Sequence, residues 1–120
     1  MQTLEKTGQK SIEWAAGLFE GEGCIYQKKG RKNPSWSIRI KMTDLDVLQS
    51  FHSTVDAGHL TGPYHPPSLK PHHKSFWHWE TAKKDDVIKV LTALLPYLGY
   101  RRAKLVLTCF QDYGLNYAIN

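Results

Sequence analysis

Apolar and polar residues alternate most regularly between Ser35 and Thr43. Trp36, Ile38, Ile40 and Met42 would share one face of an extended chain, and Ser35, Ser37, Arg39 and Lys41 the other. This alternation predicts a β-strand over residues 35–43 with one apolar and one basic face. The strand-like residues 24–28 precede it, and turn residues at about 30–34 join the two into a hairpin.

A different spacing, typical of helices, marks four further segments. Residues 11–20 form the first helix, and Ser11 can cap its start. Gly21 and Gly23 are expected to end this helix, because glycine readily adopts the left-handed conformation that closes helices. Asp44 is expected to cap a second helix, residues 45–55, through a side-chain bond to a free backbone amide. Two more helices are predicted at about 85–95 and 101–112.

A second hairpin is predicted from residues 59–64 and 74–81, joined by the proline-rich segment HPPSLKPHHK. Trp77 and Trp79 should face the core. The resulting order, α-β-β-α-β-β-α-α, predicts an α+β fold in which helices cover one side of an antiparallel sheet. We expect one domain over residues 1–120, with its core at about 11–113, and an opposite sheet face open to solvent or a ligand.

The composition excludes several classes of protein. No apolar run approaches the ~20 residues of a membrane span, and the first residues, MQTLEKTGQKS, lack the apolar centre of a signal peptide. Two cysteines predict neither a disulfide framework nor a zinc site. The histidines His65, His72, His73 and His78 match no common zinc spacing, so DNA contact or a solvated loop is favoured. We therefore expect an intracellular protein.

The charges are segregated along the chain, whose net charge is +5. All 11 acids lie outside two windows, residues 23–43 and 57–79, which cover the first predicted hairpin and most of the second. Such segregation indicates a face that meets a polyanion, and the alternative is a solvated surface that is merely basic.

One segment carries a motif. AAGLFEGEG, Ala15 to Gly23, resembles the LAGLIDADG motif, with Ala15 in the leucine position and glutamate in both aspartate positions. The element order is similar to that of a LAGLIDADG homing endonuclease, and PYLGYRRAKLVL, Pro96 to Leu107, resembles the C-terminal region of that family. The resemblance covers residues 11 to about 110. It implies a saddle-shaped sheet and a site-specific, double-strand DNA endonuclease that promotes intron homing.

The residues themselves explain part of the motif. Gly17 and Gly21 lie on one side of the first helix, where no side chain keeps a second backbone away. A chain with one motif should therefore form a homodimer, whose predicted interface is Ala16, Gly17, Glu20 and Gly21. The two-fold axis would bring two copies of Glu22 together at helix ends, where they repel unless a cation lies between them. Mg²⁺ suits such a site because it keeps several waters.

The resemblance also assigns roles. Glu22 and the carbonyl of Gly21 correspond to the metal ligands, whereas Glu20 is expected to give local support. Asp44 corresponds to a polar residue beside the catalytic centre, and the helix cap is its equally weighted alternative. The family often has a lysine entering the last helix; Arg101 is the candidate for its role here, followed by Lys104 and Arg102.

A two-stranded ribbon fits the major groove of DNA. The residues expected to face it are Tyr26, Lys28, Ser35, Ser37, Arg39, Lys41, Tyr64, Lys74, Phe76, His78 and Glu80. Lys29, Arg31 and Lys32, at a hairpin tip, and Arg102 and Lys104 are expected to hold phosphates. A dimer would then recognise a long pseudo-palindromic target. The alternative function is a nucleic-acid-binding protein without cleavage, such as a regulator or an intron RNA splicing helper, and the presence of Glu22 favours the enzyme.

Overall fold

The computed structural model describes residues 8–28, 35–66 and 74–115. Its elements follow the predicted order, with a 3-10 turn before the last helix. Their bounds are α1 Ile12–Glu22, β1 Gly23–Gln27, β2 Trp36–Met42, α2 Leu45–Val55, β3 His59–Tyr64, β4 Phe76–Thr81, α3 Lys84–Leu94, η1 Leu95–Tyr97 and α4 Tyr100–Asp112.

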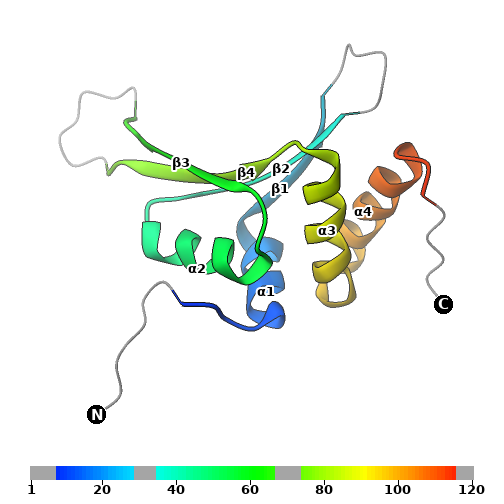
Figure 1. The fold of residues 1–120 in the computed structure, drawn as a ribbon, viewed down its shortest axis with the longest axis horizontal. Helices are drawn as coiled ribbons and strands as arrows, with labels where there is room; N and C mark the ends of the chain where they lie inside the picture. Colours follow the sequence, from blue (N-terminus) through cyan, green and yellow to red (C-terminus); the bar gives the residue numbers. More distant parts are fainter. Residues whose placement is uncertain (1–7, 29–34, 67–73, 116–120) are drawn as a thin grey trace.

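The four strands form one antiparallel sheet in the order β1-β2-β4-β3. Each hairpin pairs internally, and β2 and β4 join the hairpins, with Ile40 opposite Trp79 and Lys41 opposite His78. The helices all lie on one side of this curved sheet (Figure 1). The predicted α+β architecture is thereby confirmed, and its second sheet face carries no helix in the described part of the chain.

The core lies between the helices and the apolar face of the sheet. Ile38 and Ile40 are fully buried there, as the alternation in β2 predicts. Phe51 of α2 packs edge-on against the Trp79 ring, with centroids 4.7 Å apart. Trp79 also donates its indole N–H to the carbonyl of Ala57 at 2.9 Å. Trp77 is half-buried against the same core, so the predicted facing of both tryptophans is confirmed.

The first helix begins as predicted but ends differently. The Ser11 hydroxyl accepts a hydrogen bond from the Trp14 amide at 3.0 Å. The helix then continues through Gly21 to Glu22, and Gly23 ends it with φ −80° and ψ 157°. The expected left-handed ending is therefore wrong. Gly23 is needed for close approach instead, because a Cβ there would lie 2.5 Å from the Phe19 ring.

The side-chain capping bond predicted for Asp44 is also wrong. Asp44 occupies the N-cap position of α2, but its side chain accepts no capping hydrogen bond from the helix. Its backbone carbonyl accepts the first helical bond, from the Val47 amide at 3.1 Å. The side chain is exposed, so water can solvate the carboxylate in place of a backbone amide.

The outer strand β3 is irregular. Its register against β4 shifts between Thr61 and Tyr64, around Gly62 and Pro63. Just before it, Gly58 adopts φ +79° against the Trp79 ring. Among the described segments, no helix combines the length and apolar character that crossing a membrane requires.

Candidate active site and nucleic-acid interface

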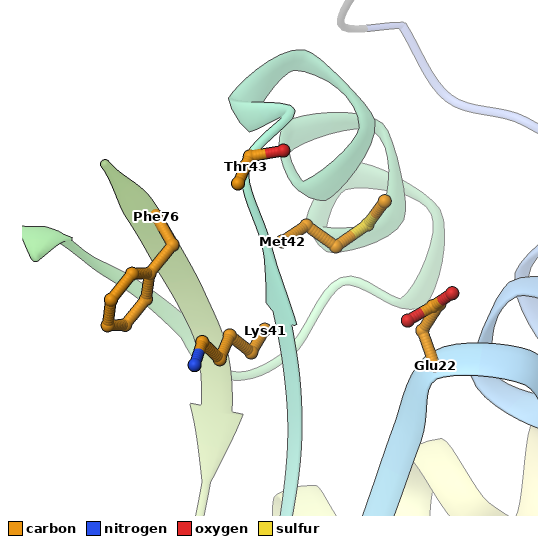
Figure 2. Close-up of a pocket in the computed structure, with 5 residues that line it drawn as sticks. All are labelled: Glu22, Lys41, Met42, Thr43 and Phe76. Carbon is orange, nitrogen blue, oxygen red and sulfur yellow. The ribbon is translucent and has the colours of Figure 1, made fainter. Parts of the chain in front are cut away.

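Glu22 lies exposed at the last position of α1. It borders a depression of about 300 Å³ together with Lys41, Met42, Thr43 and Phe76. Figure 2 shows Lys41 extending toward Phe76, while Glu22 stands on the other side of the depression. Because Gly23 pairs with Ile40, the next residues outward, Glu22 and Lys41, come from adjoining chain segments. The fold thus places an acidic side chain, Glu22, and a basic one, Lys41, at the rim of the same depression.

The end of α1 also determines which backbone oxygens are available. The Phe19 carbonyl accepts from the Gly23 amide, and the Glu20 carbonyl accepts from Nε of Arg102 at 3.0 Å. Gly21 has no helical partner for its carbonyl, because the residue four positions on already belongs to β1. The Gly21 carbonyl and the Glu22 carboxylate are therefore oxygen donors at one helix end, a set that fits a hard divalent cation.

Within one chain, the described side chains do not by themselves enclose a metal ion. The described residues contain no group of three or more histidine, cysteine, aspartate or glutamate side chains that could hold an ion. Of the histidines considered for zinc, His65 bonds to the Ser75 hydroxyl at 3.0 Å through Nδ1, and His72 and His73 lie outside the described residues. A cation at Glu22 would complete its shell with water or with a second copy of the chain.

Glu20 connects α1 to α4, as the local support expected of it requires. Its carboxylate accepts hydrogen bonds from the Gly99 amide and from Nε of Arg102, the latter at 2.8 Å. The Arg102 guanidinium also lies 5.9 Å from the centre of the Phe19 ring, and only 15% of its side chain is exposed. Arg102 is thus engaged in structure, whereas Arg101 is exposed at the start of α4.

The glycines of α1 leave part of its surface bare. Gly17 and Gly21 are exposed, and a Cβ built on either would meet no described atom within 4 Å. Ala16 differs, because its side chain is fully buried in the core of its own chain. Ala16 therefore has no exposed surface with which to contact a second chain, which contradicts its inclusion in the predicted interface. We call the exposed surface at Gly17 and Gly21 the glycine strip.

Basic side chains of the open sheet face are held over aromatic rings. The Arg39 guanidinium lies 5.6 Å from the centre of the Tyr26 ring, and Lys41 Nζ lies 4.2 Å from that of Phe76. Lys28 and Lys74 are exposed, whereas Lys29, Arg31 and Lys32 lie outside the described residues. Lys104, exposed on α4, lies with Nζ 5.3 Å from the centre of the Tyr100 ring.

Ser37 departs from its predicted place in the DNA-facing set. Ser37 lies on the same face of β2 as Arg39 and Lys41, but only 3% of it is exposed. Its hydroxyl has no hydrogen-bond partner among the described residues. Tyr26 lies directly opposite on β1, and Arg39 follows two residues later on the same face. These larger neighbours flank the short serine side chain, so a groove contact from Ser37 is contradicted.

Three rings on β3 and β4 pack together in a way that strand alternation does not reveal. Tyr64 lies 5.5 Å from Phe76 and 4.8 Å from His78, and Phe76 lies 5.6 Å from His78, between ring centroids. We call these three residues the aromatic cluster. Burial lowers the pKa of His78, Arg39 and Lys41 lower it further, and Glu80 opposes them. The only sequence signal was the spacing of Phe76 and His78 on one strand face.

No protein-family model and no curated protein sequence matches this chain. Solved structures do. The homing endonuclease I-CvuI, in complex with a DNA target in the presence of Mg, matches with a TM-score of 0.65 and 19% identity over 87% of this chain and 66% of that one. The homing endonuclease I-TnaI matches with a TM-score of 0.65 and 17% identity, over 86% of this chain and 71% of that one. The group I intron-encoded I-CeuI, complexed with DNA, matches with a TM-score of 0.62 and 15% identity, over 92% of this chain and 55% of that one.

The chain thus spans just under two thirds of the length of I-CvuI and about half that of I-CeuI. At these identities the likeness concerns the fold. It covers most of the present chain. The protein has the fold of the homing endonucleases.

Proposed function

We propose that this chain is a site-specific double-strand DNA endonuclease, which acts as a homodimer with Mg²⁺ on a long pseudo-palindromic target. The observation that carries the proposal is the position of Glu22. Its exposed carboxylate lies at the end of α1, next to the glycine strip on one side and the basic sheet face on the other. The fold shared with DNA-bound homing endonucleases supports the same conclusion.

The glycine strip is the surface through which the two subunits meet. Two helices without side chains at Gly17 and Gly21 can approach closely, and a two-fold axis there makes the same patch meet itself. Each α1 would then end beside its symmetry mate. Two Glu22 carboxylates and two helix C-termini would share a small volume, which favours cations strongly.

The Glu22 carboxylate and the Gly21 carbonyl would hold Mg²⁺, with water completing its coordination. When bound, the ion supplies a Lewis acid for the phosphate and lowers the pKa of a coordinated water. The side chains around it orient the DNA: Lys41 binds phosphate at the rim of the depression, and Arg101 does so from the start of α4. Asp44, whose carboxylate makes no helix cap, holds water near the strand end.

The open sheet face binds the duplex. Arg39, Lys41 and Lys28 lie on this face or at its end, in one of the acid-free windows. Their contacts with phosphates and guanines would displace counterions from DNA, so affinity should fall steeply as salt rises. A protein that binds DNA in this way but never cuts it would fit the alternative of an inactive binding protein.

The test is cleavage of a plasmid pool that carries a randomised insert, with Mg²⁺, followed by sequencing of the linearised products. Glu22→Gln should lower cleavage by roughly a hundredfold or more, a loss typical of groups that stabilise developing charge, while binding measured in Ca²⁺ persists. Glu13→Gln is the matched control, because Glu13 is an exposed acid at the opposite end of α1. Equal cleavage by the Glu22 variant would refute the site; binding without cleavage by the unmodified protein would favour the alternative.

A further inference from the structure

The aromatic cluster of Tyr64, Phe76 and His78 forms a patch of rings on a sheet face that carries several cations and the acid Glu80. Tyr64 is 38% exposed, and Phe76 and His78 are half-buried. Phe76 also borders the depression beside Glu22. The proposed Mg²⁺ chemistry uses none of these rings, so their position on the open sheet face needs another explanation.

The packing of the rings limits what they can bind. Tyr64 and Phe76 stack on each other at an interplanar angle of 30°, and the ammonium of Lys41 lies 4.2 Å from the centre of the Phe76 ring. Ring faces that are engaged in this way are poorly available for stacking on an unpaired base. Apolar contacts with small groups do not require a free ring face, so they are the kind of contact that this packing favours.

Duplex DNA offers such a group in the groove where a β-ribbon binds. On their major groove edge, the base pairs are distinguished by their hydrogen-bond donors and acceptors and by the C5-methyl group of thymine, which is the only methyl group of the four bases. The surrounding charges direct the patch toward that edge, because Lys41 and Arg39 on the adjoining strand attract the flanking phosphates. Burial, Arg39 and Lys41 lower the pKa of His78 against the opposing effect of Glu80, which favours the uncharged imidazole in this cluster.

We propose that Tyr64, Phe76 and His78 form a thymine-methyl contact in the major groove, which makes the aromatic cluster a specificity determinant of the target. This inference rests on the proposed function, because it requires the sheet face to bind double-stranded DNA. It assigns the β3–β4 hairpin a different task from that of β1–β2, where the cations Lys28, Arg39 and Lys41 lie on the open face or at its end. The two hairpins would therefore read different base pairs by different chemistry.

The experiment compares thymine with uracil, which lacks only the methyl group. A duplex selected for tight binding from a randomised pool in Ca²⁺ is synthesised twice, once with thymidine and once with deoxyuridine at every thymidine position. Dissociation constants are measured at one fixed salt concentration. Burying one methyl predicts about a fourfold weaker binding of the uracil duplex, and two symmetric half-sites about fifteenfold.

Two variants identify the residues responsible. In Phe76→Ser the preference for thymine should shrink toward onefold, and thermal unfolding of the variant verifies that it is folded. Lys28→Ala, the matched control, removes an exposed cation from the end of β1 and should weaken binding to both duplexes equally. Its ratio of the two constants should stay that of the unmodified protein.

The outcomes separate this inference from the proposed function. Tight, salt-sensitive binding with equal affinity for the thymine and uracil duplexes would overturn the methyl contact and leave the DNA-binding function standing. A preference that persists unchanged in Phe76→Ser would also overturn it. Tighter binding to single-stranded DNA than to either duplex would assign the rings to stacking instead, and no binding to any DNA would overturn the proposed function itself.

Discussion

Replacing Gly17 by alanine should act on the folded chain and on the dimer in opposite directions. Within one chain, the new methyl group meets no described atom within 4 Å, so it causes no clash. Gly17 lies in the interior of α1, where alanine is favoured over glycine by about 1 kcal/mol. The folded monomer should therefore gain about 1 kcal/mol, which for a domain of this size raises the melting temperature by roughly 4 °C.

In the dimer the same methyl group lies where two helices are proposed to touch. An added group in a close-packed contact costs about 1–3 kcal/mol. The dimer dissociation constant should rise roughly 5-fold to 150-fold as a result. Cleavage should fall at protein concentrations where the variant is monomeric, and should recover as the concentration is raised.

The assay combines sedimentation velocity over a concentration series with urea unfolding at a concentration where the protein is monomeric. Thr92→Ala is the control, because Thr92 is exposed on α3 and a better helix former there should raise stability without changing association. If Gly17→Ala destabilises the monomer, the surface at Gly17 is not bare. If it stabilises the monomer and leaves association unchanged, the subunits do not meet at the glycine strip.

Three further predictions concern other parts of the molecule. Gly58→Ala should lower the free energy of unfolding by about 2–4 kcal/mol, measured by urea denaturation, because alanine is strained at φ +79° and its Cβ would lie 2.7 Å from the Trp79 ring. Glu20→Gln should cost about 1–2 kcal/mol in the same assay, since a neutral amide bonds more weakly to Arg102 and the Gly99 amide. The lowered pKa of His78 means that the unfolded chain takes up a proton, at its ordinary pKa of 6.5, before the folded chain does. The protein should therefore lose stability as the pH falls below about 6.5, and His78→Gln should reduce that loss.

The sequence predicted the elements because most of them depend on local patterns. Alternation in β2 identified Ile38 and Ile40 as core residues, and the Ser11 cap followed from the residue that precedes an apolar helix. Features that depend on distant neighbours were missed. The contact of Glu20 with Arg102 spans 82 positions. The burial of Ser37 depends on the size of Tyr26 across the strand pair, which the pattern of one strand does not contain.

In the candidate site, too, the sequence predicted what depends on a local motif and missed what depends on distant neighbours. Glu22 and Gly21 were identified through the motif, and the structure adds the depression and the carbonyl arrangement around them. Whether Gly23 ends α1 in an extended or a left-handed conformation depends on the nearby Phe19 ring, so glycine alone was an ambiguous signal. The aromatic cluster required a register between β3 and β4 that an irregular strand conceals.

The irregular strand β3 also affects how readily the sheets of two molecules can pair edge to edge. A sheet that keeps one face bare for a ligand also exposes an outer strand, whose unpaired backbone groups can recruit a strand from another molecule. In β3 the pairing register breaks at Gly62 and Pro63, and proline has no N–H with which to extend the ladder. At this margin, growth of the sheet from copy to copy should therefore be hindered, so that β1 is the edge at which a strand of another molecule could add more easily.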